Sequence, residues 1–143
     1  MRRALARPTP PWPRLHMGNR YLIVSDLHLA DVEDHDDGWM AYKGSRYLFD
    51  EEFRQLVADF TAQGQGGDRL TLVLNGDIIN FDVITAVPEE ASWPVSRAER
   101  KRGLDSTEAK SAWKLELVLS QHPVFVETLA GFISAGHQLV YVL

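Results

Sequence analysis

The chain has no cysteine among its 143 residues. This absence excludes disulfide bridges, zinc–thiolate sites and thiol nucleophiles, so any metal must be held by nitrogen and oxygen ligands. It also fits a reducing compartment, and we expect a cytoplasmic protein. Long apolar runs are missing too. The longest are far shorter than a bilayer-spanning helix requires, so we expect no transmembrane segment.

An excess of positive charge is also lacking. The net charge of -5 argues against nucleic acid as the default partner, because a phosphate backbone attracts basic surfaces. Hydrophobic residues make up 45% of the chain and charged residues 24%, which is ordinary for a globular domain with its own core. Residues 1–19 are different, being basic and rich in proline. We expect a disordered tail there, with Met17 as an alternative start of the protein.

Two apolar runs each end in side chains that bind hard metal ions. Residues 21–25 lead into Asp26 and His28, and residues 70–75 lead into Gly76 and Asp77. Both runs are continuous rather than alternating, which predicts fully buried strands. Parallel strands of an open α/β sheet bind ligands at their carboxyl ends. The pattern therefore predicts a metal site at one edge of a sheet.

The segments between and after these strands predict helices and one more strand. Apolar spacing indicates a helix over 47–62, and a capping box from Asp105 to Glu108 indicates a helix to about Ser120. A further helix begins near Pro123 and ends at Gly136, and residues 138–143 form a third buried strand. Residues 83–104 are expected to be irregular. The insert over 83–120 leaves the predicted metal edge, so we expect it to govern substrate selectivity.

Three side chains are the predicted metal ligands. If Asp26 keeps strand geometry, its carboxylate and the imidazole of His28 point to one face and reach the same ion. Asp77 arrives from the neighbouring strand, where a carboxylate can bridge two ions about 3.5–4 Å apart. Gly76 before it lets the backbone turn tightly and leaves room for the ions.

These residues resemble the calcineurin-like metallophosphoesterase superfamily. The similarity rests on Ser-Asp-Leu-His-Leu at 25–29, on Leu-Asn-Gly-Asp at 74–77, and on a helix ending in Gly-His before an apolar strand. It covers residues 21–82 well and 123–143 in outline. The resemblance implies an α/β fold that is the N-terminal half of a metallophosphoesterase-type β-sandwich flanked by helices, with largely parallel strands. Residues 20–143 would form an incomplete metallophosphoesterase domain.

The resemblance also implies an activity and a role for each residue. The activity is phosphoester hydrolysis by a metal-bound hydroxide at a site of two divalent ions, which could be Mn, Fe, Zn or Mg. Asp26 and His28 would hold the first ion and Asp77 would bridge both. Asn80 stands where the family commonly has Asp and would act from the second shell, and Asp82 is a weaker candidate.

The family pattern continues after its third strand with Gly-Asn-His-Asp, a lone His and Gly-His-x-His. The catalytic His and the remaining ligands are therefore expected beyond Leu143. Two alternatives stay open. One is a nuclease or cyclic-nucleotide phosphodiesterase with the same chemistry. The other is a non-catalytic fragment or a binding or scaffolding module that kept the fold and lost turnover.

For the other polar and aromatic residues, we favour solvation, packing or capping over ligand binding. An acidic loop is expected to be solvated, although it could form a further metal site. The basic run 97–102 is expected to be a solvated face, although it could grip a phosphate or a phospholipid head group. His122 and His137 are expected to pack or cap rather than to bind a metal, and Trp93 and Trp113 to pack rather than to stack on a base or sugar. The acidic loop comprises Asp31, Glu33, Asp34, His35, Asp36 and Asp37.

Overall fold

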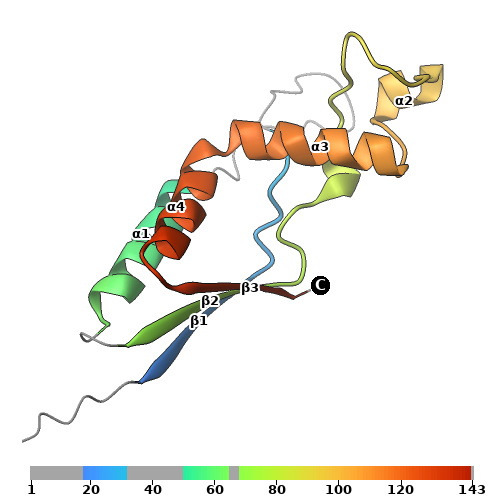
Figure 1. Cartoon of the computed structure of the whole chain (residues 1–143). Helices are drawn as coiled ribbons and strands as arrows, with labels where there is room; N and C mark the ends of the chain where they lie inside the picture. The colour runs from blue at the N-terminus through green and yellow to red at the C-terminus, as the bar shows by residue number, and fades with distance from the viewer. Residues whose placement is uncertain (1–17, 32–49, 65–67, 143) are drawn as a thin grey trace, which may run out of the picture.

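Three parallel strands form the sheet around which the chain is built. The computed structural model describes residues 18–31, 50–64 and 68–142. The strand order is β1-β2-β3, with both neighbouring pairs parallel, and the helices lie on one side of the sheet (Figure 1). The predicted α/β class with parallel strands is thus confirmed. The elements are β1 (Asn19–Ser25), α1 (Asp50–Ala62), β2 (Arg69–Asn75), the 3-10 turn η2 (Phe81–Val83), α2 (Arg97–Arg102), α3 (Glu108–Gln121), α4 (Pro123–Ser134) and β3 (Gln138–Val142).

The two faces of the sheet differ in burial. The register aligns Leu22, Leu72 and Leu139 across the sheet, and this row packs into the core below the helices. On the opposite face, Ile23 is 67% exposed. The prediction that β1 is fully buried is therefore wrong, and no described segment covers its second face. The prediction of a buried third strand is wrong as well, since Tyr141 of β3 is 52% exposed. Both are edge strands of the described sheet.

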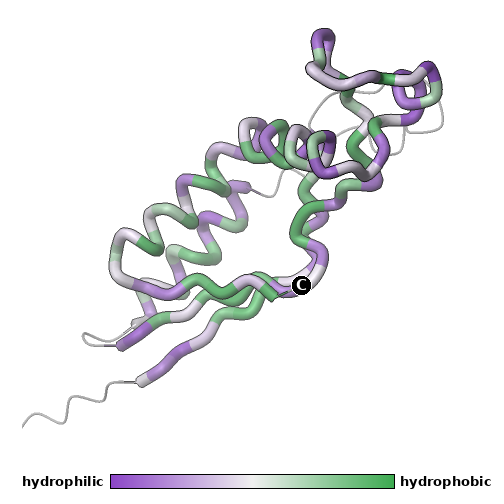
Figure 2. Tube along the Cα trace, turned by 45° about the vertical axis from the view of Figure 1, so that its right-hand side comes forward, coloured by the Kyte–Doolittle hydropathy of each residue, from purple (hydrophilic) through white to green (hydrophobic). Residues whose placement is uncertain are grey.

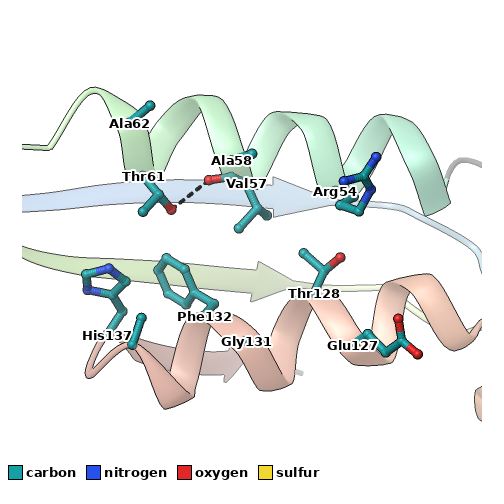
Figure 3. Close-up of a pocket in the computed structure, with 11 residues that line it drawn as sticks. Arg54, Val57, Ala58, Thr61, Ala62, Glu127, Thr128, Gly131, Phe132 and His137 are labelled. Atoms are coloured by element: carbon teal, nitrogen blue, oxygen red, sulfur yellow. Dashed lines mark hydrogen bonds between the residues drawn. The ribbon is translucent and has the colours of Figure 1, made fainter.

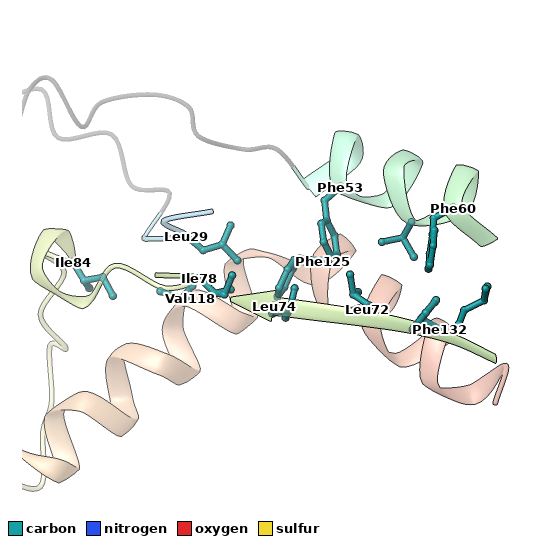
Figure 4. Packing of buried hydrophobic residues seen from close by; sticks show 12 residues of the cluster. Leu29, Phe53, Phe60, Leu72, Leu74, Ile78, Ile84, Val118, Phe125 and Phe132 are labelled. Carbon is teal, nitrogen blue, oxygen red and sulfur yellow. The ribbon is translucent and has the colours of Figure 1, made fainter. Parts of the chain in front are cut away.

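The core lies between the sheet and the helix pair α1 and α4. Phe53 of α1 meets Phe125 of α4 with ring centroids 4.8 Å apart, and Phe60 meets Phe132 at 6.5 Å. These rings lie over the buried side chains of β2 (Figure 4). Tilted aromatic pairs at such distances add to the stabilisation that burial provides. The aromatic residues at helical spacing thus fix α1 and α4 side by side.

The helix boundaries follow local signals, with one exception. Pro123 occupies the first turn of α4, and Gly136 with φ 87° follows the end of that helix. The predicted capping box opening α3 is wrong, because the N-cap of that helix is Thr107, without a side-chain cap. A complete capping box instead joins Ser96 and Glu99 at the start of α2. Among the helices of the described ranges, none is long and apolar enough to cross a bilayer.

The insert holds a short helix within 83–104, where the sequence predicts irregular structure. Residues 97–102 form α2, whose basic side chains are exposed, and this hydrophilic stretch lies far from the sheet (Figure 2). Lys110 of α3 ties the two helices together. Its ammonium contacts Glu99, lies 2.8 Å from Asp105 and sits 5.7 Å from the centre of the Trp93 ring. Trp93 therefore packs in the insert.

The Glu99 contacts make the insert sensitive to acid. The hydrogen bond from the Lys110 ammonium, followed by the bonds from Ser96, holds the pKa of Glu99 well below its ordinary value. A carboxyl with a lowered folded-state pKa stabilises the fold above its unfolded pKa, and this stabilisation is lost as the pH falls through the folded pKa. We expect Glu99→Gln to melt below the wild type at pH 7, with the gap narrowing below about pH 4. Melting curves across pH measure this. A gap that does not change with pH would contradict the assignment.

Candidate functional site

The segments that follow β1 and β2 continue side by side beyond the strands. The ladder ends at the pair Ser25 and Asn75, but the His28 N–H still donates to the carbonyl oxygen of Asp77 at 3.0 Å. Leu29 bonds in the same way to Ile78 at 2.8 Å, and the N–H of Asn80 returns to Leu29 at 2.9 Å. The backbone therefore places Asp26, His28 and Asp77 at one edge of the sheet. The Gly76 N–H donates to the carbonyl of Val142 at 2.9 Å, which brings the end of β3 to the same edge.

Asp26 and His28 have an unusual backbone conformation. Their φ angles are 55° and 49°, and within the described residues no other non-glycine residue has a positive φ. The expectation that Asp26 keeps strand geometry is therefore wrong, since β1 ends at Ser25. Left-handed backbone costs most L-residues about 1–2 kcal/mol, and Asp and His are among the types that adopt it most often. Such strain collects at functional sites and persists where the surrounding structure enforces it.

Gly76 leaves space beside the Asp26 carboxylate. Gly76 has φ 71°, a conformation that glycine adopts at no steric cost. A Cβ at this position would lie 3.9 Å from Oδ1 of Asp26, so larger side chains would extend toward the carboxylate. The absent side chain thus keeps the approach to Asp26 open from the β2 side.

The three predicted ligands lie at the same edge of the sheet, but their side chains do not converge on one point. Asp26, His28 and Asp77 are exposed, and no ion pair among the described residues involves any of them. Across 18–31, 50–64 and 68–142, no three His, Asp or Glu side chains gather closely enough to hold a metal ion. The donor set itself, two carboxylates and one imidazole on adjoining backbones, suits a divalent metal of the Mn, Fe or Zn type.

Asn80 lies beside the imidazole of His28. Its amide nitrogen is 3.5 Å from His28 Nδ1, and its amide oxygen accepts from the N–H of Asp82 at 3.2 Å. An imidazole that accepts at Nδ1 carries its proton on Nε2, which blocks Nε2 as a ligand. Metal binding through Nε2 therefore requires the Nδ1–H form and a rotated Asn80 amide that accepts from it. The side chain of Asp82 is exposed and takes no part in the contact between Asn80 and His28.

The expectation of a solvated acidic loop is wrong for Asp31. It is only 7% exposed, and its Oδ2 accepts hydrogen bonds from the N–H groups of Thr85 at 3.2 Å and Ala86 at 3.1 Å. The loop after β1 is thereby attached to the segment after η2. The other acidic-loop residues, within 33–37, lie outside the described residues.

Two further buried groups hold the site loops and were missed as site residues. His122 joins Asp50 to the carbonyl oxygen of Ala30, and the Lys114 ammonium donates to the carbonyl oxygen of Phe81 at 3.1 Å. His122 lies between α3 and α4, which agrees with the expected packing role at a helix junction. The partners are far apart in sequence, and no local pattern points to them.

A groove with a volume of about 540 Å³ lies between α1 and α4 (Figure 3). Val57, Thr61 and Phe132 are among the residues that line it, and Arg54 and Glu127 lie at one end. His137 lies at the other end, with its ring 4.8 Å from the Phe132 ring, near the start of β3 and therefore at the opposite edge from Asp77. The groove is separate from the predicted metal edge.

Comparisons with protein-family models, with curated proteins and with solved structures find no match to this chain.

Proposed function

We propose that this chain carries the first metal-binding half of a metal-dependent phosphoester hydrolase similar to the calcineurin-like metallophosphoesterases. One observation carries the proposal. The two described non-glycine residues with left-handed backbone are Asp26 and His28, which are the ligands that the motif predicts. A backbone that accepts this cost at both positions of Asp-x-His, and is paired there to the Gly76-Asp77 turn, is typical of a functional site.

The residues then divide the chemistry among them. Asp26 and His28 would hold one divalent ion, and Asp77, which follows β2, would contribute a further carboxylate. When bound, such ions supply an activated water and neutralise charge on the phosphoryl oxygens. Gly76 keeps the space beside Asp26 open. With its amide rotated, Asn80 would accept from the Nδ1–H of His28 and leave Nε2 to face the ion, which is a second-shell role.

Asp77→Asn tests the metal site directly. We expect this chain to bind Mn²⁺, and we expect the substitution to weaken the binding about tenfold or more, because a neutral amide replaces a charged ligand of nearly the same shape. Electron paramagnetic resonance of free Mn²⁺ measures the affinity. Asp59→Asn is the matched control. It makes the same change on α1, and the amide oxygen can still accept from Gln55. Equal Mn²⁺ affinity of Asp77→Asn and the wild type would overturn the proposal.

Turnover is tested on the product of the complete reading frame, because the resemblance places a catalytic His and further ligands after Leu143. We expect Mn²⁺-stimulated hydrolysis of a p-nitrophenyl phosphoester. Preference for the monoester indicates a phosphatase, and preference for bis-p-nitrophenyl phosphate indicates a nuclease or phosphodiesterase. Absence of metal-stimulated hydrolysis of either ester contradicts the enzyme function.

A non-catalytic binding module is the second candidate, and Asn80 favours it. The amide faces Nδ1 of His28 as a donor, which opposes ligation through Nε2. Asn80→Asp separates the two candidates, because a carboxylate accepts from Nδ1–H and so favours Nε2 as a ligand. A gain in Mn²⁺ affinity in this variant, together with absence of turnover in the wild type, supports the binding module.

A further inference from the structure

We infer that the buried pair of His122 and Asp50 is a positioning device for the backbone that carries His28. The inference rests on the proposed metal site and assigns these two residues a role that the motif does not include. Three observations support it. They are the contacts of His122, the left-handed backbone at His28, and the hydrogen bonds that attach Asp31 to the segment after η2.

His122 connects three distant parts of the chain at one buried point. Its side chain is 1% exposed, and Nδ1 lies 2.7 Å from Oδ1 of Asp50 at the start of α1. Nε2 lies 2.9 Å from the carbonyl oxygen of Ala30. The other carboxylate oxygen of Asp50 faces the N–H of Phe125 at 3.4 Å, in the first turn of α4. The pair thus joins the helix layer to the loop that follows β1.

Both ring nitrogens of His122 face acceptors. A carboxylate oxygen stands at Nδ1 and a backbone carbonyl oxygen at Nε2. The ring and the Asp50 carboxylate thus form a hydrogen-bonded pair in a buried setting. Such a pair has a fixed geometry, because loss of either bond leaves a buried polar group without a partner.

His122 bonds to the carbonyl oxygen of Ala30, which lies two residues after the left-handed backbone of His28. Leu29 bonds to the segment after β2, and Asp31 holds the N–H groups of Thr85 and Ala86. The hydrogen bond from His122 holds Ala30, which lies between these two attached residues. Strained backbone persists where several contacts over-determine it. Without the hold on Ala30, the φ of His28 can relax, and the backbone no longer fixes its imidazole at the edge that carries Asp26 and Asp77.

Two conservative substitutions separate positioning from general stability. His122→Asn keeps a donor at the place of Nδ1, so it retains the contact with Asp50 and loses Ala30. His122→Gln keeps a donor at the place of Nε2, so it retains Ala30 and loses Asp50. Both variants lose part of a buried network, and we expect both to melt below the wild type. The inference predicts that only His122→Asn weakens Mn²⁺ binding, by about tenfold, with His122→Gln within about threefold of the wild type.

Lys110→Met is the control for general destabilisation. Lys110 is 7% exposed, lies on α3 and pairs with Glu99 and Asp105. Its contacts lie in the insert and not in the loop after β1. We expect this variant to lose stability while its Mn²⁺ affinity stays within about twofold of the wild type, because distant sites act independently.

A second readout keeps the inference separate from the proposed function. The ¹³Cα chemical shift of His28 reports its backbone conformation without any metal. We expect His122→Asn to move this shift away from the wild-type value and His122→Gln to leave it near that value. If the wild type binds no Mn²⁺, the proposed function fails and the His28 shift alone decides the inference. Equal shifts and equal Mn²⁺ affinities in both variants overturn it.

If His122→Asn does not fold, hydrogen exchange in the wild type decides. The inference requires a slowly exchanging Nε2–H on His122, and it requires the His28 and Leu29 amides to open together with it. Amides that exchange independently of the His122 ring overturn the positioning role.

Discussion

Phe125→Ala is expected to lower the free energy of unfolding by about 3–5 kcal/mol. Phe125 is 3% exposed and lies against Phe53 of α1 with ring centroids 4.8 Å apart. Its loss removes apolar burial and leaves a cavity between the two helices that the surrounding side chains fill only in part. Urea denaturation followed by circular dichroism measures the change through the midpoint at constant slope.

Ile133→Ala is the matched control for Phe125→Ala. Ile133 lies on the same helix but is 49% exposed, so truncation removes little buried surface and leaves no enclosed cavity. We expect a loss of about 1 kcal/mol or less. Similar losses for the two variants would mean that the α1–α4 contact contributes little to the stability of the fold.

The parts of the fold that local patterns encode were predicted from the sequence. The apolar runs gave three strands at the expected places, and Pro123 marked the start of α4. The parallel arrangement followed from helices lying between the strands. The start of α2 was also available, because Ser96 and Glu99 have the spacing of a capping box. Asp105 has the same spacing to Glu108, but its carboxylate pairs with Lys110 instead of capping the helix.

The features that depend on distant contacts could not be predicted. The burial of Asp31 arises from N–H groups that lie 54 and 55 residues later in the chain. The exposure of β1 depends on its edge position, which a continuous apolar run does not reveal. The left-handed conformation of Asp26 and His28 occurs where the loop after β1 bonds to the segment after β2, which is distant in sequence. Motif spacing therefore places the predicted ligands on one edge, while tertiary contacts determine how their backbone is held.

Asp50→Leu is expected to be as damaging as the loss of a core aromatic ring, at about 3–5 kcal/mol. The substitution leaves the 1%-exposed imidazole of His122 without its carboxylate partner and leaves the N–H of Phe125 without an acceptor. A buried polar group without a partner costs more than its hydrogen bond contributes when it is intact. Urea denaturation measures this loss, with Glu52→Leu on the exposed face of α1 as the control.

The double variant Asp50→Leu with His122→Leu shows whether the pair acts as one unit. We expect it to lose about 3 kcal/mol, clearly less than the sum of the two single losses, because the second substitution removes the polar ring that the first leaves without its partner. The cost that persists is that of two backbone groups without partners, the carbonyl of Ala30 and the N–H of Phe125. Additive losses in this cycle would mean that the two side chains do not form a coupled buried pair. A double variant that recovers stability while its Mn²⁺ binding stays weak would separate the two roles of the pair, because leucine can fill the space of the imidazole but cannot hold the carbonyl of Ala30.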